Sequence, residues 1–69
     1  MNVPNTYHAT LHYLPLQGAA RAIDSTYLRA MHDPLGTAWA ALGKHPGGRY
    51  RITIRPVTPS EMGMVELPA

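Results

Sequence analysis

Basic side chains are the residues best placed to do chemistry in this 69-residue sequence. Arg49, Arg51 and Arg55 fall within seven positions, and Lys44 lies just before them. On an extended segment the three arginines project from one face, at spacings of roughly 6.6 and 13 Å. Guanidinium groups bind carboxylates and phosphates through paired N–H donors. The pattern predicts a surface that contacts an acidic protein. Nucleic-acid phosphate is the alternative ligand, and simple solubilisation of the sheet is the non-functional interpretation.

The histidines are the next candidates, because His8 and His12 have the four-residue spacing that binds zinc on a helix. Their surroundings alternate as in a strand, which separates the two side chains by roughly 13 Å. One zinc ion with bonds of about 2 Å cannot bridge that distance. We therefore expect no metal site, and we group His8 and His12 with the arginines as partner-binding residues.

Catalytic groups are sparse, since the chain has no cysteine and only four acidic residues. Ser25 and Ser60 lack the surrounding turn and oxyanion loop of a serine nucleophile. The glycines of residues 43–48 lack the Gly-Lys-Ser/Thr ending of a phosphate-binding loop. The sequence thus predicts a non-enzymatic protein with no catalytic residues and no cofactor.

Two segments with a period of two indicate the strands that carry these side chains. In residues 6–14, Tyr and Thr are frequent and apolar residues alternate with His8, Thr10 and His12. In residues 49–57, Tyr50, Ile52 and Ile54 alternate with the arginines. Residues 62–67 are compatible with a third, short strand.

The segment between these strands has apolar residues at steps of three or four, which favours helix. Pro34 interrupts it, and Asp33 before it is a suitable N-cap. The pattern predicts helices at 18–32 and 34–43, with one apolar stripe across the joint. The stripe consists of Ile23, Tyr27, Met31, Leu35, Trp39 and Leu42.

These elements make residues 1–69 a single α+β domain with the order β-α-β-β. Two or three strands form a small sheet, and the Pro-kinked helical segment packs on its apolar face. The opposite face, with the histidines and arginines, would have nothing in the chain to cover it. Its aromatic residues Tyr7, Tyr13 and Tyr50 would all point toward the helices, which disfavours base stacking and hence nucleic acid.

Size and charge point to a partner chain. The sequence has a net charge of +2, charged residues are 14% of it, and no disulfide can stabilise so small a domain. The sheet also has edges that can pair with another strand. We expect a homodimer or a stable hetero-complex. Neither a signal peptide nor a membrane span is expected, which places the protein in the cytoplasm.

In size and layout the chain resembles small phage-encoded inhibitors, including anti-CRISPR proteins. The resemblance rests on the strand Tyr7–Tyr13, the Ala-rich region 18–43 and the strand Arg49–Arg55, and no motif carries a residue role across. It implies an inhibitor that binds a host assembly, such as a CRISPR–Cas complex, inside the host cell. Many such inhibitors are acidic DNA mimics, and this basic chain does not fit that mechanism.

Overall fold

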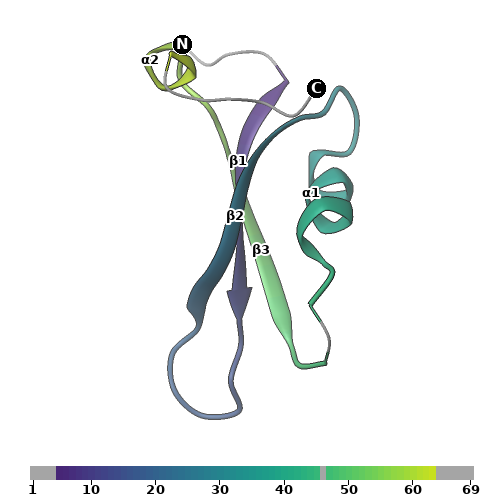
Figure 1. Ribbon diagram of the computed structural model, residues 1–69, viewed down its shortest axis with the longest axis vertical. Helices are drawn as coiled ribbons and strands as arrows, with labels where there is room; N and C mark the ends of the chain where they lie inside the picture. The colour runs from purple at the N-terminus through teal and green to yellow at the C-terminus, as the bar shows by residue number, and fades with distance from the viewer. Residues whose placement is uncertain (1–4, 46, 64–69) are drawn as a thin grey trace.

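Three antiparallel strands form the sheet of this protein in a computed structural model that describes residues 5–45 and 47–63. They are β1 (Thr6–Tyr13), β2 (Arg21–Arg29) and β3 (Tyr50–Pro56), and β1 lies in the centre of the order β2-β1-β3. Helix α1 (Pro34–Leu42) packs on one face, and the short α2 (Pro59–Met62) follows β3 (Figure 1). The α+β class is confirmed, but the predicted order β-α-β-β is wrong: the elements follow the order β-β-α-β, and α2 comes after them.

The core forms where the alternating apolar residues of the strands meet α1. Leu11 pairs with Ile52 and Ala9 with Ile54, so these side chains share one face. Ala9 and Leu11 are fully buried, and the helix contributes Ala38 and Leu42 to the same cluster. The alternation predicted for β1 and β3 is therefore confirmed, and we call this side the helix face.

Helix α1 begins and ends close to the predicted residues. Asp33 is the N-cap and accepts a hydrogen bond from the Gly36 N–H at 3.1 Å, while Pro34 occupies the first turn. The Gly43 N–H donates to the Trp39 carbonyl at the other end. No helix among the described residues is long and apolar enough to cross a membrane.

The predicted helix at 18–32 is wrong, because most of this segment is strand β2. Its middle, from Ile23 to Tyr27, contains β-branched, aromatic and short polar residues that favour strands or turns over helix. Pairing with β1 satisfies its backbone groups and overrides the weak helical spacing. The predicted stripe is broken accordingly, and Ile23 and Met31 are 41% and 76% exposed.

The chain after β3 turns into α2, a helix that is not predicted from the sequence. Thr58 is the N-cap and Pro59 the first helical residue. The predicted short strand at 62–67 is not seen at its start, since Met62 ends α2. Its remainder, from residue 64, lies outside the described residues.

Candidate binding site

The sheet surface opposite α1 carries most of the predicted site residues, and we call it the open face. It is formed by side chains that alternate with the core positions on all three strands. On β1 these are His8, Thr10 and His12, on β2 Ser25, Tyr27 and Arg29, and on β3 Arg51, Thr53 and Arg55.

Strand register brings four of the six predicted residues together. His8 lies opposite Arg55 and His12 opposite Arg51 on neighbouring strands. Arg49 directly precedes β3, and its carbonyl accepts a hydrogen bond from the Leu14 N–H. Lys44 follows α1, so its backbone lies on the helix side of the sheet and apart from the open face. The open face thus gathers two histidines and two arginines, with Arg49 at its margin.

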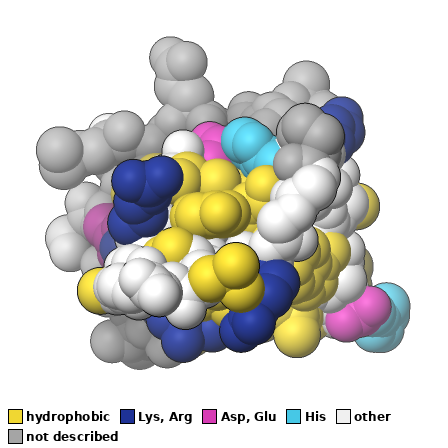
Figure 2. All heavy atoms as spheres, turned by 90° about the horizontal axis from the view of Figure 1, so that it is seen from below, with side chains coloured by type: hydrophobic (Ala, Val, Ile, Leu, Met, Phe, Trp, Pro, Cys, Tyr) yellow, Lys and Arg dark blue, Asp and Glu magenta, His cyan; other side chains and the backbone are white. Residues whose placement is uncertain are grey.

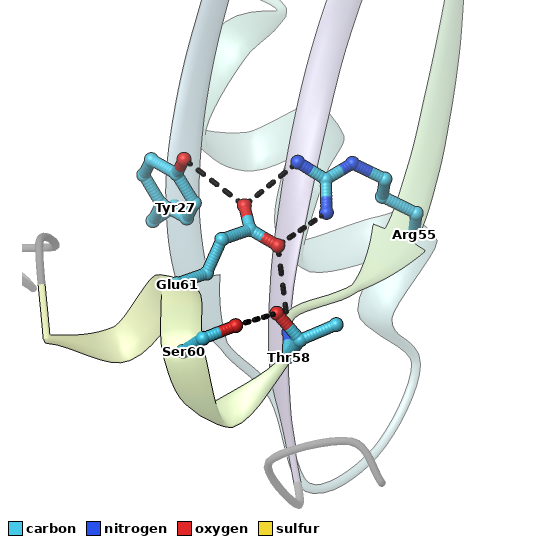
Figure 3. Close-up of polar contacts among 5 residues, drawn as sticks. All are labelled: Tyr27, Arg55, Thr58, Ser60 and Glu61. Atoms are coloured by element: carbon cyan, nitrogen blue, oxygen red, sulfur yellow. Dashed lines mark hydrogen bonds and ion pairs between the residues drawn. The ribbon is translucent and has the colours of Figure 1, made fainter.

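One end of the open face is covered, contrary to the expectation that nothing in the chain covers it. Glu61 of α2 reaches over the central strand and binds Arg55 through two hydrogen bonds of 2.7 Å (Figure 3). The Tyr27 hydroxyl donates to the same carboxylate at 3.3 Å, so Glu61 links β2 to β3. The Thr58 N–H also faces this carboxylate at 3.4 Å.

These contacts determine the charge at this end. The hydrogen bonds from Arg55 lower the pKa of Glu61 from its ordinary 4.5 to about 2, and the carboxylate in turn raises the pKa of Arg55. Both groups are charged at neutral pH, and their charges compensate each other. Arg55 is therefore already paired within the chain, which weakens its case as a free partner-binding residue.

The rest of the open face keeps accessible polar groups. The His12 ring nitrogen Nε2 lies 2.9 Å from the Thr53 hydroxyl. Arg51 is exposed, and among the described residues its side chain has no ion-pair or hydrogen-bond partner. Two open hollows of about 400 Å³ flank the central strand and share His8 and Thr10. Arg51 and Arg49, together with the exposed Arg29 opposite Thr6, are thus the basic groups of the open face that remain available to another molecule.

Sequence reasoning missed Tyr27 and Glu61 as members of this surface. The spacing of apolar residues predicts a helix around Tyr27, but this residue lies on the open face with its ring 4.6 Å from that of His8. Glu61 lies outside every element predicted from the sequence. The spacing Thr58-x-x-Glu61 is that of a helix N-terminal capping box and was the signal for α2.

A second polar cluster lies on the helix face near the start of β3. His45 is 3.5 Å from Asp24, and its ring lies 6.1 Å from that of Tyr50. Arg21 sits 5.5 Å above the Tyr13 ring. The His45 contacts hold the segment after α1 against β2 and β3, the Arg21 contact joins β2 to β1, and we assign all of them a structural role. No group of three potential metal ligands occurs among residues 5–45 and 47–63.

The end of the molecule near the β1–β2 connection has a mixed surface. Figure 2 shows this end, where Lys and Arg side chains border a hydrophobic area. Leu16 in the connection is 91% exposed. The open face is therefore not the sole exposed surface, but it is the one on which strand register gathers most of the predicted site residues.

A scan against protein-family models gave no match, and comparisons with curated proteins and with solved structures found no significant similarity. The functional argument therefore rests on the geometry of the open face.

Proposed function

We propose that the protein is a non-enzymatic binding module whose open face contacts an acidic surface of a protein partner. The observation that carries the proposal is Arg51, which lies beside His12 and has no hydrogen-bond or ion-pair partner among the described residues. Another arginine of the same strand, Arg55, already holds a carboxylate. The bidentate Arg55–Glu61 pair is an internal example of how a guanidinium on this face binds an acid. Arg51, Arg49 and His12 would form the equivalent contacts with a partner.

The resemblance to small phage-encoded inhibitors supplies the partner class to test first. We propose a host assembly of several subunits, such as a CRISPR–Cas complex, bound in the host cytoplasm. A module of this size inhibits by occupying a surface that the assembly needs. The proposal requires neither cofactor nor metal.

Charge reversal on the two sides of the sheet tests this proposal. Arg51→Glu changes the open face, while Lys44→Glu makes the same change of net charge on the helix side. We expect Arg51→Glu to reduce the capture of specific proteins from cell lysate by at least about tenfold. The new carboxylate would repel the acidic groups of the partner that Arg51 attracts in the wild type. Lys44→Glu should capture the same proteins at nearly the wild-type level.

Both variants should melt at the wild-type temperature, because neither side chain has a hydrogen bond or ion pair to lose among the described residues. Bound proteins are compared by quantitative mass spectrometry and melting is followed by circular dichroism. Equal capture by Arg51→Glu and wild type would remove the open face from the proposed function.

A nucleic-acid-binding module is the second candidate, and the position of Tyr27 favours it. Its ring and that of His8 place aromatic surface on the open face, where a base could stack. Arg55 beside them is already paired with Glu61 and does not offer its guanidinium to phosphate, which makes this the weaker proposal. Anisotropy titrations of labelled single-stranded DNA and RNA at two salt concentrations distinguish the two. Affinity that falls steeply with salt supports phosphate binding.

A further inference from the structure

The two edges of the sheet differ in how their outward backbone groups are satisfied. On the β3 side, the Leu14 N–H donates to the Arg49 carbonyl and the Val57 N–H to the Thr6 carbonyl. In an antiparallel pair, residues that bond the neighbouring strand alternate with residues whose backbone groups point away from it. These two bonds therefore fix which residues of β3 belong to each set. The backbone groups of Arg51, Thr53 and Arg55 face β1, so those of Ile52 and Ile54 point away from the sheet.

The β2 edge is closed by local interactions. The Ala30 N–H donates to the Asn5 carbonyl, which directs the backbone of Ser25 and Tyr27 outward. The Ser25 N–H is taken by the Asp24 carboxylate at 2.9 Å, and the Tyr27 carbonyl accepts from the Thr26 hydroxyl at 3.3 Å. A register shift opposite Leu11 and His12 also makes this strand irregular. Such features prevent pairing with another strand.

The β3 edge lacks these protections. Its pairing with β1 is regular from Tyr50 to Pro56, without a register shift. No side chain of the described residues is bonded to the outward backbone groups of Ile52 and Ile54. Pro56 carries no N–H and marks the end of the edge. An added strand would therefore meet at least these two donor–acceptor pairs.

Side-chain charge selects the occupant of this edge. Residues of an added strand lie alternately beside the arginines on the open face and beside Ile52 and Ile54 on the helix face. If a second copy paired through β3 with its two-fold axis at Arg51, the Arg51 side chains of the two copies would lie opposite each other. With the axis at Tyr50, Arg49 would lie opposite Arg51 of that copy. Like charges in directly opposite positions are destabilising.

We propose that the β3 edge binds an extended acidic segment of the partner protein and adds it to the sheet as a fourth strand. Its carboxylates would lie beside Arg51 and Arg49, and its apolar side chains beside Ile52 and Ile54. Backbone hydrogen bonds supply affinity in such complexes, while alternate side chains supply specificity. This inference rests on the proposed function and specifies how the acidic partner is held.

Amide hydrogen exchange measured by NMR tests the proposal on the intact chain. The probe is a capped seven-residue peptide of alternating valine and glutamate, and a valine–lysine peptide is its control. We expect the valine–glutamate peptide to slow exchange of the Ile52 and Ile54 amides by at least tenfold, since they gain hydrogen-bond acceptors. The amides of Arg51 and Thr53 are paired with β1 in both states and should change little.

A backbone modification isolates the edge from the side chains. The 69-residue chain can be assembled chemically with N-methyl isoleucine at position 54. Removing this donor and adding a methyl group at the edge should weaken peptide binding by about tenfold or more. N-methylation of Arg29, whose N–H points outward on the β2 edge, is the matched control. It should leave the affinity for the peptide within twofold of that of the unmodified chain.

The possible failures are distinguishable. If Arg51→Glu weakens peptide binding but the Ile52 and Ile54 amides exchange unchanged, the acidic ligand lies on the open face. Strand addition is then overturned and the proposed function stands. If these amides are already protected without peptide, increasingly so at higher protein concentration, a second copy occupies the edge and the proposal fails. If the peptide binds wild type and Arg51→Glu equally, or not at all, both proposals are contradicted.

Discussion

At the scale of single residues, Glu61 has the largest number of distinct roles in the structure. It pairs with Arg55, accepts from the Tyr27 hydroxyl and faces the Thr58 N–H. One side chain thus attaches α2 to two strands that are not neighbours in the sheet. It also removes one of the two arginines of β3 from the charge available to a partner.

The low pKa of Glu61 predicts a pH-dependent contribution to stability. Its carboxyl has a folded pKa of about 2 against an ordinary 4.5, so the stabilisation is complete above about pH 4.5 and is lost as the pH falls toward 2. We expect Glu61→Gln to melt below wild type at neutral pH, with a difference that shrinks between pH 4.5 and 2. Thermal melts across this range provide the measurement.

Ser60→Ala is the matched control for this prediction, because it alters α2 but keeps the Arg55–Glu61 pair. It should retain the wild-type pH dependence in the acid range. A difference between Glu61→Gln and wild type that stays constant down to pH 2 would contradict the assigned role of the pair.

At the scale of elements, α1 depends on a strained N-cap. Asp33 has a φ of 48°, in the left-handed region that few residues other than glycine, asparagine and aspartate adopt. Its carboxylate accepts from the Gly36 N–H and its carbonyl from the Thr37 N–H. A Cβ at Gly36 would lie 2.1 Å from an Asp33 carboxylate oxygen, so the glycine leaves room for the cap.

Substitutions at position 33 should therefore separate the contribution of the N-cap hydrogen bond to stability from that of the negative charge. Asp33→Ala loses the acceptor and keeps the unfavourable φ, and we expect it to lower the free energy of unfolding by about 1 kcal/mol or more. Asp33→Asn retains both the acceptor and the tolerance for this conformation and should remain within a few tenths of a kcal/mol. Urea unfolding measures the free energy of unfolding of both variants. Equal losses in Asp33→Ala and Asp33→Asn would show that the negative charge, and not the hydrogen-bond acceptor, stabilises the helix.

At the scale of the whole molecule, the protein is elongated and its core is small. Its extents are 38 × 20 × 18 Å, and it exposes 4935 Å², compared with roughly 4,300 Å² expected for a compact chain of its mass. Much of the sheet has a covering helix on one side only. A binding partner would bury part of this surface, in agreement with the proposed hetero-complex.

The small core makes stability sensitive to its central residue. Leu11 is fully buried on the central strand, and Leu11→Ala is expected to cost about 2–5 kcal/mol. That is a large share of the total free energy of unfolding for a domain of this size. The melting temperature should therefore fall by more than about 10 °C, or the transition should lose its cooperativity.

The control for Leu11 is Leu16, which is 91% exposed in the β1–β2 connection. Leu16→Ala removes the same atoms and should melt within about 2 °C of wild type. Similar melting of the two variants by circular dichroism would mean that Leu11 does not lie in the core that the structure describes.

Local patterns in the sequence determined the elements whose signals are short-range. The alternation around His8 and His12 and around Arg51 and Arg55 specified β1 and β3, because neighbouring residues of a strand must face opposite sides. Asp33 and Pro34 determined the start of α1 through the needs of its unpaired N–H groups. From these followed the α+β class and the grouping of histidines with arginines on one face.

Only the tertiary structure decided the segment before Asp33 and the surroundings of Arg55. Between Ile23 and Leu28 the helical spacing and the strand-forming residue types conflict, and pairing with β1 resolves the conflict in favour of β2. Glu61 lies six positions from Arg55, and its bond to Tyr27 spans 34 positions. Contacts between distant residues depend on how elements pack, and local spacing does not encode that packing. For this reason the sequence indicated the basic face, while the fold decided which arginines remain free on it.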